Sequence, residues 1–311
     1  MQTTNKRKLF TKGPYLMDGG METTLIFHEG IELNHFASFE LINTEEGRQT
    51  LKNYFRPYLE TADQYNLDFI LEAPTWRANK DWGHRMGYSQ DDLDQINRDS
   101  IAFMRECAET HKDINTIISG CIGPRGDGYE TGQMMTANEA LVYHRKQVQT
   151  LTLADADLIS AYTLTYKEEG LGIVLAAKEV NIPVVISFTL ETDGRLPSGE
   201  SLKEVIEQID SATDNYPEHF MINCAHPEHF KDILSEDGAW KERIKGIRAN
   251  ASKKSHAELD ESVELDIGDM DGLATEYLQL KDLLPNLLCY AGCCGTDHRH
   301  IGKICETVFQ K

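Results

Sequence analysis

Eight short apolar segments recur along this chain, and helix-like patterns of hydrophobic residues lie between them. The segments are YLMDGG (15–20), DFILEAP (68–74), TIISGCIG (116–123), DLISAYT (157–163), PVVISFT (183–189), HFMINCA (219–225), KGIRANA (245–251) and LLCYAGCC (287–294). The helix-like patterns include 44–66 after the candidate cap Asn43, 89–112, 136–154 starting at Thr136, and 200–213. Nearly continuous apolar strands that alternate with helices are typical of parallel sheets covered on both faces, and eight such units in about 250–300 residues predict a TIM barrel.

The predicted fold class is therefore α/β, a single (β/α)8 barrel. We expect one domain over 1–311 with a core of about 12–308, because no Pro/Ser-rich stretch or long charge run divides the chain. A doubly wound open sheet is the alternative. That fold usually has a glycine-rich phosphate turn after its first strand, and DGGME at 18–22 does not match it.

Charge and hydropathy narrow the classes of partner. The 311 residues include 31 Lys and Arg against 51 Asp and Glu, a formal net charge of −20. Such a charge repels phosphate backbones and anionic lipid headgroups, so we expect neither a nucleic acid nor a membrane as partner. No apolar segment approaches the ~18 residues of a membrane span, and the first residues lack the apolar stretch of a signal peptide. These patterns predict a cytoplasmic protein, and they say nothing of its oligomeric state.

Seven cysteines, an odd number, argue against a disulfide framework in a chain without a secretion signal. Three of them, Cys224, Cys293 and Cys294, lie at the ends of the sixth and eighth segments, and strand ends of a closed barrel lie close together. Three thiolates predict a zinc site with one open position. A closed structural site completed by a nearby histidine, and buried cysteines without a metal, are the alternatives. We interpret Cys107, Cys121, Cys289 and Cys305 as packing residues.

The motifs DGGMETTL, INCAHPE and AGCCGTD together resemble the homocysteine S-methyltransferase family, whose members use S-methylmethionine, betaine or folate donors. The resemblance extends from Asp18 to about Ile304 and includes GCIGPRGDGY (120–129) and SFTLETDGRLPSGESL (187–202). It implies a (β/α)8 barrel in which Cys224, Cys293 and Cys294 bind one Zn²⁺ ion. Zinc with three thiolates carries a net charge of about −1, so a substrate thiol binds it as a thiolate that stays nucleophilic.

The resemblance also implies substrate-binding residues. Asp18, Gly19 and Gly20 match the opening motif, where the glycine backbone approaches the amino-acid part of the thiol. The fourth segment of the family ends in a glutamate and a threonine, and this chain has Tyr162 and Thr163 there. Losing a charge-assisted contact to the substrate ammonium costs about 1.5–3 kcal/mol. Glu72 is a candidate replacement carboxylate, with an exposed rim acid as the alternative.

Other candidates at the strand ends are less specific. Asn223 precedes the first cysteine and is expected to donate to a metal-bound sulfur or to be a plain strand-end amide, and Asn250 matches a family asparagine. Trp76 and Trp82 follow the second segment and are candidates for an aromatic wall around a methylated cation, or for loop packing.

The leading hypothesis is a cytoplasmic zinc-dependent S-methyltransferase of methionine biosynthesis that methylates homocysteine. The chain shows none of the extra modules of folate- and cobalamin-dependent enzymes, which favours S-methylmethionine or S-adenosylmethionine as the small donor. Two other hypotheses remain at this stage. One is the same chemistry on a different thiol, because Tyr162 replaces the family glutamate. The other is a noncatalytic zinc- or redox-responsive protein that uses Cys293 and Cys294.

Overall fold

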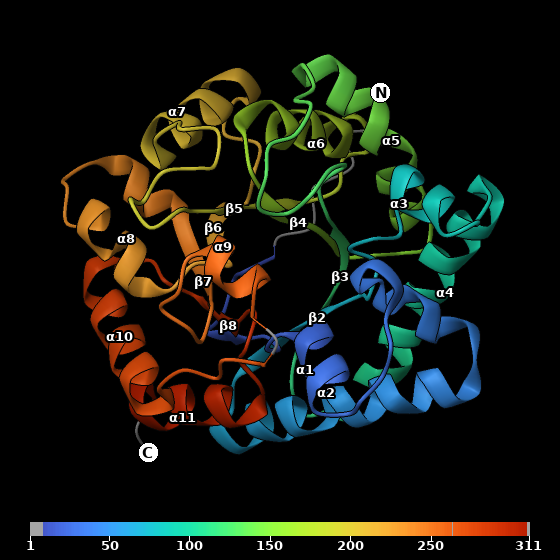
Figure 1. Ribbon diagram of the computed structural model, residues 1–311, viewed down its shortest axis with the longest axis horizontal. Coiled ribbons are helices and arrows are strands. Elements are labelled where there is room, and N and C mark those ends of the chain that lie inside the picture. The colour runs from blue at the N-terminus through green and yellow to red at the C-terminus, as the bar shows by residue number, and fades with distance from the viewer. Residues whose placement is uncertain (1–8, 263, 310–311) are drawn as a thin grey trace.

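A closed barrel of eight parallel strands forms the centre of the computed structural model, which describes residues 9–262 and 264–309 (Figure 1). Each strand pairs with its sequence neighbours, and β1 closes the barrel by pairing with β8. The strands are β1 (Tyr15–Leu16), β2 (Asp68–Glu72), β3 (Thr116–Ile122), β4 (Leu158–Leu164), β5 (Val184–Thr189), β6 (His219–Asn223), β7 (Ile244–Ala249) and β8 (Cys289–Gly292). Each predicted apolar segment overlaps one of them, so the predicted (β/α)8 barrel is confirmed.

Helices surround the barrel in the order of the chain (Figure 1). They are α1 (Met21–Phe27), α2 (Glu45–Tyr65), α3 (Lys80–Arg85), α4 (Gln90–Ala108), α5 (Ala137–Leu153), α6 (Lys167–Val180), α7 (Leu202–Thr213), α8 (Pro227–Leu234), α9 (His256–Asp260), α10 (Met270–Leu283) and α11 (His298–Val308). Three 3-10 helices accompany them: η1 (Asn34–Phe36), η2 (Ser38–Asn43) and η3 (Ala239–Arg243). Among the described residues, none of these helices combines the length and apolar character that crossing a bilayer requires.

Local capping explains where two of the predicted helices begin. Thr136 starts α5 with a capping box, in which its hydroxyl accepts from the backbone N–H of Glu139 and the Glu139 carboxylate accepts in return. The predicted cap Asn43 is wrong by one residue, because the Thr44 hydroxyl accepts from the Gly47 N–H at 3.0 Å and begins α2. Asn43 ends η2 instead.

The two main layers of the core are separated by the wall of the barrel, and a third, smaller cluster between η2 and α4 includes Phe39, Leu93 and Ile96. A larger layer packs between strands and helices and includes Cys107 and Cys305. A smaller one fills the barrel interior and includes Cys121 and Cys289. Successive strand side chains point to opposite faces, so both layers draw on the same strands. The four cysteines interpreted as packing residues all lie in these layers, as predicted.

Candidate functional site

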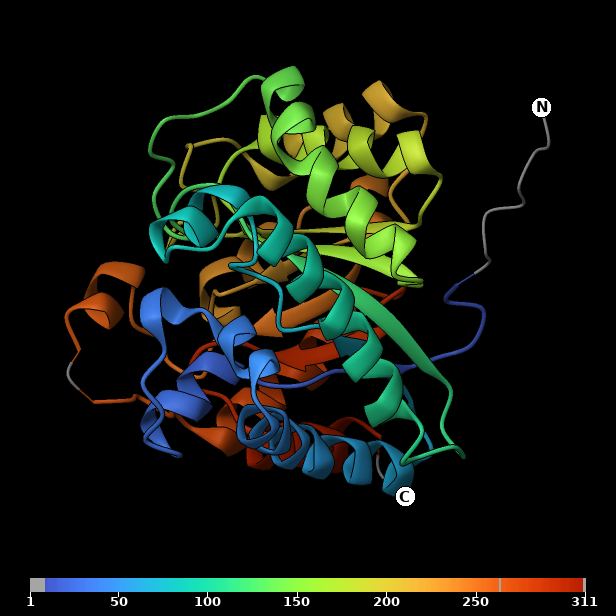
Figure 2. The same ribbon diagram turned by 90° about the vertical axis from the view of Figure 1, so that its right-hand side faces the viewer.

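A cavity of about 360 Å³ opens at the carboxyl ends of the strands. The strand ends contribute Asp18, Glu72, Tyr162, Thr163, Asn223, Cys224, Arg248, Cys293 and Cys294 to its lining. In Figure 2, the blue segment after β1 and the orange segment that carries α9 both lie at the left of the view, at this end of the barrel. Gly20 and Trp76 also line the cavity, whereas Gly19, Trp82 and Asn250 are not among the described lining residues.

The three predicted metal-ligating cysteines come together in this cavity. The Sγ atoms of Cys224, Cys293 and Cys294 all lie within 4.8 Å of one another. Cys224 follows β6, whereas the other two follow β8, so the closed barrel brings together thiols that lie about 70 residues apart in the chain. Only sulfur atoms belong to this group within the described part of the chain.

Local backbone geometry fixes the direction of the first thiol. Cys224 has φ of +52°, in the left-handed region that a residue with a Cβ adopts at a cost of about 1–2 kcal/mol. Its backbone N–H donates to the Arg248 carbonyl at 3.1 Å, and its carbonyl lies 2.6 Å from His256 Nε2. These contacts hold the strained turn in place.

The electrostatics of the cluster favour one thiolate. Hydrogen bonds from Cys224 and Cys294 lower the pKa of Cys293 well below its usual value, and Arg248 adds a favourable positive charge. Hydrogen bonds with Cys293 and Cys294, together with burial, raise the pKa of Cys224. Tyr129 borders the cluster, with its hydroxyl 3.3 Å from Cys294 Sγ and its ring stacked on His256 at 4.2 Å.

This donor set fits a thiophilic metal ion such as zinc. Three buried or half-buried sulfur atoms are ligands of the kind that zinc prefers, and a group of three leaves a position for a substrate. Two histidines that follow these cysteines in the sequence have other partners. His226 Nδ1 accepts from the Glu228 N–H at 3.2 Å, and His300 Nδ1 accepts from the Asp297 N–H at 3.1 Å.

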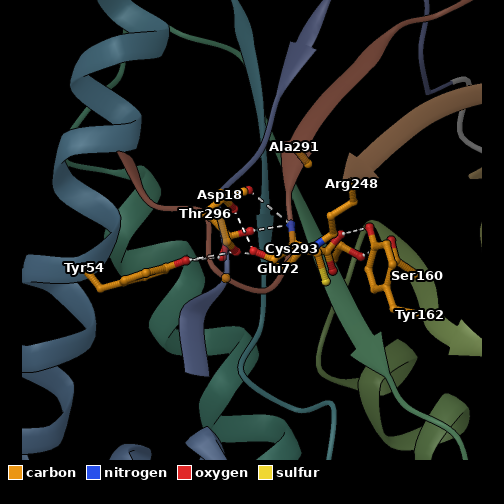
Figure 3. Close-up of polar contacts among 12 residues, drawn as sticks. Asp18, Tyr54, Glu72, Ser160, Tyr162, Arg248, Ala291, Cys293 and Thr296 are labelled. Carbon is orange, nitrogen blue, oxygen red and sulfur yellow. Dashed lines mark hydrogen bonds and ion pairs between the residues drawn. The ribbon is translucent and has the colours of Figure 1, made fainter. Parts of the chain in front are cut away.

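Tyr162 and Glu72 form a buried pair in the cavity. The Tyr162 hydroxyl donates to Glu72 Oε1 at 2.9 Å, and Glu72 Oε2 has no hydrogen-bond partner among the described residues (Figure 3). Burial raises the pKa of Glu72 to about 7, although Arg248 and Tyr162 act in the opposite direction. Glu72 is 4% exposed, so the alternative of an exposed rim acid is wrong.

Arg248 is a functional candidate that the sequence analysis missed. It projects from β7 and donates to Asp18 Oδ1 at 2.7 Å and to the Gly19 carbonyl at 2.7 Å (Figure 3). The second Asp18 oxygen accepts from the Tyr54 hydroxyl at 2.9 Å, so the Asp18 carboxylate already has a counter-ion and two donors. The signal in the sequence was an arginine in the middle of a predicted buried strand segment, KGIRANA.

The glycines of the opening motif permit close backbone packing. A Cβ on Gly20 would lie 2.6 Å from the Cys293 carbonyl oxygen, and one on Gly19 would lie 2.8 Å from the Thr296 carbonyl oxygen. Only glycine allows β1 and the segment after β8 to approach this closely. These two residues therefore hold the end of β1 against the cysteine pair.

Asn223 holds the end of β4. Its Oδ1 accepts from the Thr163 N–H at 3.0 Å and from the Ser187 hydroxyl at 2.6 Å, and its Nδ2 donates to Thr163 Oγ1 at 2.9 Å. Thr163 has φ of +60°, a genuine outlier for a β-branched residue. The described contacts thus tie Asn223 to its neighbouring strands, with no hydrogen bond to a cysteine sulfur among them.

Trp82 and Asn250 lie outside the described lining of the cavity. Trp82 is buried, and its Nε1 donates to the Gly126 carbonyl at 3.2 Å. Asn250 is 1% exposed, and its backbone N–H donates to the Ala225 carbonyl at 3.1 Å. Trp82 packs the loop after β2, which was the alternative to an aromatic wall. Trp76 lines the cavity, and its Nε1 donates to the Tyr162 carbonyl at 3.4 Å.

Known proteins are similar to this chain in sequence. A family model described as homocysteine S-methyltransferase matches residues 15–308. Homocysteine S-methyltransferase 1 of Arabidopsis thaliana is 25% identical over 244 residues, which cover 71% of this chain and 72% of that protein. A selenocysteine Se-methyltransferase of Brassica oleracea var. italica is 24% identical over 311 residues, which cover 92% and 86%.

Solved structures agree on the fold. The oxidised form of the homocysteine methyltransferase MmuM from Escherichia coli has a TM-score of 0.75 and 18% identity, covering 94% of this chain and 96% of that chain. A metallated form of the same protein has a TM-score of 0.73. At this identity, the likeness supports the barrel and its connectivity.

Proposed function

Because this chain belongs to the homocysteine S-methyltransferase family and is a methyltransferase, we propose that it transfers a methyl group from a small onium donor to the thiol of homocysteine, giving methionine. The observation that carries the proposal is the cluster of three thiols in one cavity at the carboxyl ends of the strands. Family membership leaves no support for the hypothesis of a noncatalytic metal- or redox-responsive protein.

Zinc is the metal that we propose for the cluster, held by Cys224, Cys293 and Cys294. When bound, zinc would act as a Lewis acid that lowers the pKa of the acceptor thiol, so that a nucleophilic thiolate is present at neutral pH. The chain's own contribution is to aim the three sulfur atoms at one point. The strained backbone of Cys224 and the close approach of Gly20 to Cys293 support that role.

Glu72 is proposed to bind the ammonium group of the acceptor. Its Oε2, which no described residue contacts by a hydrogen bond, belongs to a side chain that lines the cavity, and Tyr162 fixes the orientation of the carboxyl group by hydrogen bonding to Oε1. Asp18 is less suited, since Arg248 already neutralises it. In this arrangement, Tyr162 stands where the family has its glutamate, and it orients Glu72. Glu72, on β2, then supplies the negative charge for the ammonium group.

A second candidate acceptor is another thiol or a selenol. The Tyr162–Glu72 pair favours it, because moving the carboxylate to β2 changes the distance at which an acceptor places its amino group. The similarity to a selenocysteine Se-methyltransferase points the same way. For the donor, S-methylmethionine and S-adenosylmethionine remain the proposed candidates. The free cysteines fit our expectation of a reducing cytoplasm. The proposed role in methionine biosynthesis rests on the proposed product, methionine.

One experiment tests the reaction. The zinc-loaded protein is incubated with homocysteine, selenocysteine and other small thiols, each with S-methylmethionine, S-adenosylmethionine or betaine, and methylated products are identified by mass. Methionine as the main product supports the leading proposal. Turnover only with another acceptor favours the second candidate, and no methylated product with any pair contradicts both.

A second experiment tests the metal site. Cys294→Ala should lose bound zinc and methyl transfer together, because one of three sulfur ligands is removed. Cys121→Ala is the matched control, since this buried thiol lines the same cavity outside the cluster and should keep one zinc per chain. Stoichiometric zinc in Cys294→Ala would refute the three-thiolate site.

A further inference from the structure

A positively charged side chain lies between the two tryptophans that follow β2. The Arg77 guanidinium carbon is 4.0 Å from the centre of the Trp76 ring and 3.8 Å from the centre of the Trp82 ring. Arg77 is 6% exposed and lines the cavity that contains the cysteine cluster. The two indoles therefore enclose a cation that belongs to the protein, and the stacked ring faces are not open to a methyl donor.

The hydrogen bonds of Arg77 leave much of its guanidinium unused. Nη1 donates to the Gly126 carbonyl at 3.0 Å, and Nε is buried without a partner in the described part of the chain. No carboxylate among the described side chains forms an ion pair with it. The acids that influence its charge most are Asp127 and Glu22. Asp127 Oδ1 accepts from the Tyr129 N–H at 2.7 Å, and Glu22 Oε1 accepts from the Ser38 hydroxyl at 2.8 Å.

A buried charge without a counter-ion lowers the stability of the folded protein. Removing an ion from water costs several kcal/mol unless a counter-ion and hydrogen bonds replace the lost hydration. Burial lowers the pKa of Arg77 only to about 10, so the side chain stays positive at neutral pH. Stacking on two aromatic rings offsets part of the cost and holds the planar group in one orientation.

We infer that Arg77 binds the carboxylate of a small substrate in the same cavity. A guanidinium presents parallel N–H donors that match the two oxygens of a carboxylate, and the stacked rings leave the edge of the group, rather than its faces, for binding. The single positive charge, with Glu22 also lining the cavity, suits a monoanion better than a phosphate dianion. This inference rests on the proposed function for the identity of the substrate.

The carboxylate that binds Arg77 can belong to either substrate, because both the onium donor and the thiol acceptor of the proposed reaction are amino acids. Binding to wild-type protein is therefore measured for two matched pairs. One pair is S-methylmethionine and its primary amide, and the other is L-homocysteine and its primary amide. Each amide keeps the shape of the acid and loses the negative charge. The pair that responds to Arg77 identifies the source.

Tryptophan fluorescence provides a readout that needs no turnover, since two of the three tryptophans stack on Arg77. Calorimetry replaces it for any variant whose fluorescence does not respond. The wild type should bind the acid of one pair about ten- to a hundredfold more tightly than its amide. Arg77→Gln should reduce that ratio to near one, and Arg77→Lys should restore part of it.

Arg85→Gln is the matched control. The Arg85 guanidinium also lies over the Trp82 ring, at 4.6 Å from its centre, but Arg85 is not among the residues that line the cavity. This variant should keep the wild-type ratio, and thermal unfolding of each variant checks that the fold is retained. An unchanged acid-to-amide ratio in folded Arg77→Gln, for both pairs, would overturn the inference.

Failure of the proposed function gives a different result. If Arg77 controls the binding ratio and no pair of substrates yields a methylated product, the carboxylate site stands and the reaction is wrong. If methionine forms while Arg77→Gln keeps the wild-type ratio, the reaction stands and Arg77 serves only to pack the loop.

Discussion

Glu72 is the buried carboxyl group that we propose for binding the ammonium group of the substrate. Its Oε1 accepts from Tyr162, and its Oε2 has no partner among the described residues, in a cavity lined by charged side chains. A buried acceptor without a partner costs about 1–3 kcal/mol, which a bound ammonium group would offset. The residue that lowers the stability of the empty protein is thus well suited to select its substrate.

Replacing Glu72 by Gln should weaken binding of homocysteine more than it slows the chemical step. Loss of a charge-assisted hydrogen bond of about 1.5–3 kcal/mol predicts a KM for homocysteine that is about ten- to a hundredfold higher. The acceptor 4-mercaptobutanoate lacks the ammonium group and should show little change. Steady-state kinetics with both acceptors checks this, with Glu22→Gln as a control for another carboxyl group of the cavity. An equal loss for both acceptors would mean that Glu72 does not bind the ammonium.

Glu72 also predicts a specific dependence of stability on pH. Its pKa is about 7 in the folded protein against a usual value of 4.5, so the folded state holds the proton more tightly. The stabilisation that comes from this tighter proton binding is fully present below pH 4.5, and it is lost as the pH rises through 7. The difference between wild type and Glu72→Gln should fall by up to about 1.4 kcal/mol per pH unit in this window. Urea unfolding of both proteins measures it, and a constant difference would contradict the raised pKa.

At the scale of single elements, β4 carries part of the local strain of the site, beside the strained backbone of Cys224. The register between β4 and β5 shifts between Ala161 and Leu164, and Thr163 within this bulge has a positive φ. The bulge brings Tyr162 and Thr163 to the cavity, and Asn223 from β6 holds it by three hydrogen bonds with its neighbours. Strain of this kind persists only where surrounding contacts determine the conformation.

The contact between α5 and α6 depends on a glycine. A Cβ on Gly172 would collide with Ala140 Cβ and lie 2.6 Å from the Leu141 nitrogen. Gly172→Ala should therefore lower the unfolding free energy by about 1–3 kcal/mol, despite the better helix propensity of alanine.

Gly302→Ala in α11 provides the comparison of opposite sign. No described atom lies within 4 Å of the position that a Cβ would take there, so alanine should raise the unfolding free energy by about 0.5–1 kcal/mol. Chemical denaturation of the two variants checks both directions. If both substitutions stabilise the protein, the helices are not packed as closely as the structure indicates.

At the scale of the whole molecule, the cysteine cluster joins distant parts of the barrel. Cys224 follows β6 and the Cys293–Cys294 pair follows β8, with β7 between them in the sheet. A ligand that binds only the folded protein stabilises it by mass action. The proposed zinc ion should accordingly act on the unfolding of the entire chain.

Removing zinc with a chelator should lower the free energy of unfolding. A free zinc concentration about a hundred times the dissociation constant corresponds to about 2.7 kcal/mol. Cys294→Ala should unfold at the same midpoint with zinc and with chelator, whereas Cys121→Ala should keep the wild-type response. Thermal or urea unfolding under both conditions measures the effect. A zinc response in Cys294→Ala equal to that of the wild type would contradict binding at the cluster.

The repeating order of the elements was readable from the amino-acid sequence. Eight apolar segments separated by helix-like segments predict a parallel sheet. A parallel sheet in which a helical crossover follows every strand closes most simply as a barrel. The cysteine triad was also predictable, since strand ends meet at one rim in that fold. The extent of a single domain over 1–311 and the roles of the individual site residues remain predictions.

Only the tertiary structure decided which polar groups of that rim pair with one another. Arg248 neutralises Asp18, Tyr162 supports Glu72, and Arg77 fills the space between Trp76 and Trp82. Local sequence does not predict the first two pairs, because each joins residues from different strands. Hydrophobic periodicity reflects which residues of a segment are buried, and the segment's own sequence shows that pattern. The partner of a buried charge depends on side-chain distances that exist only once the barrel has closed.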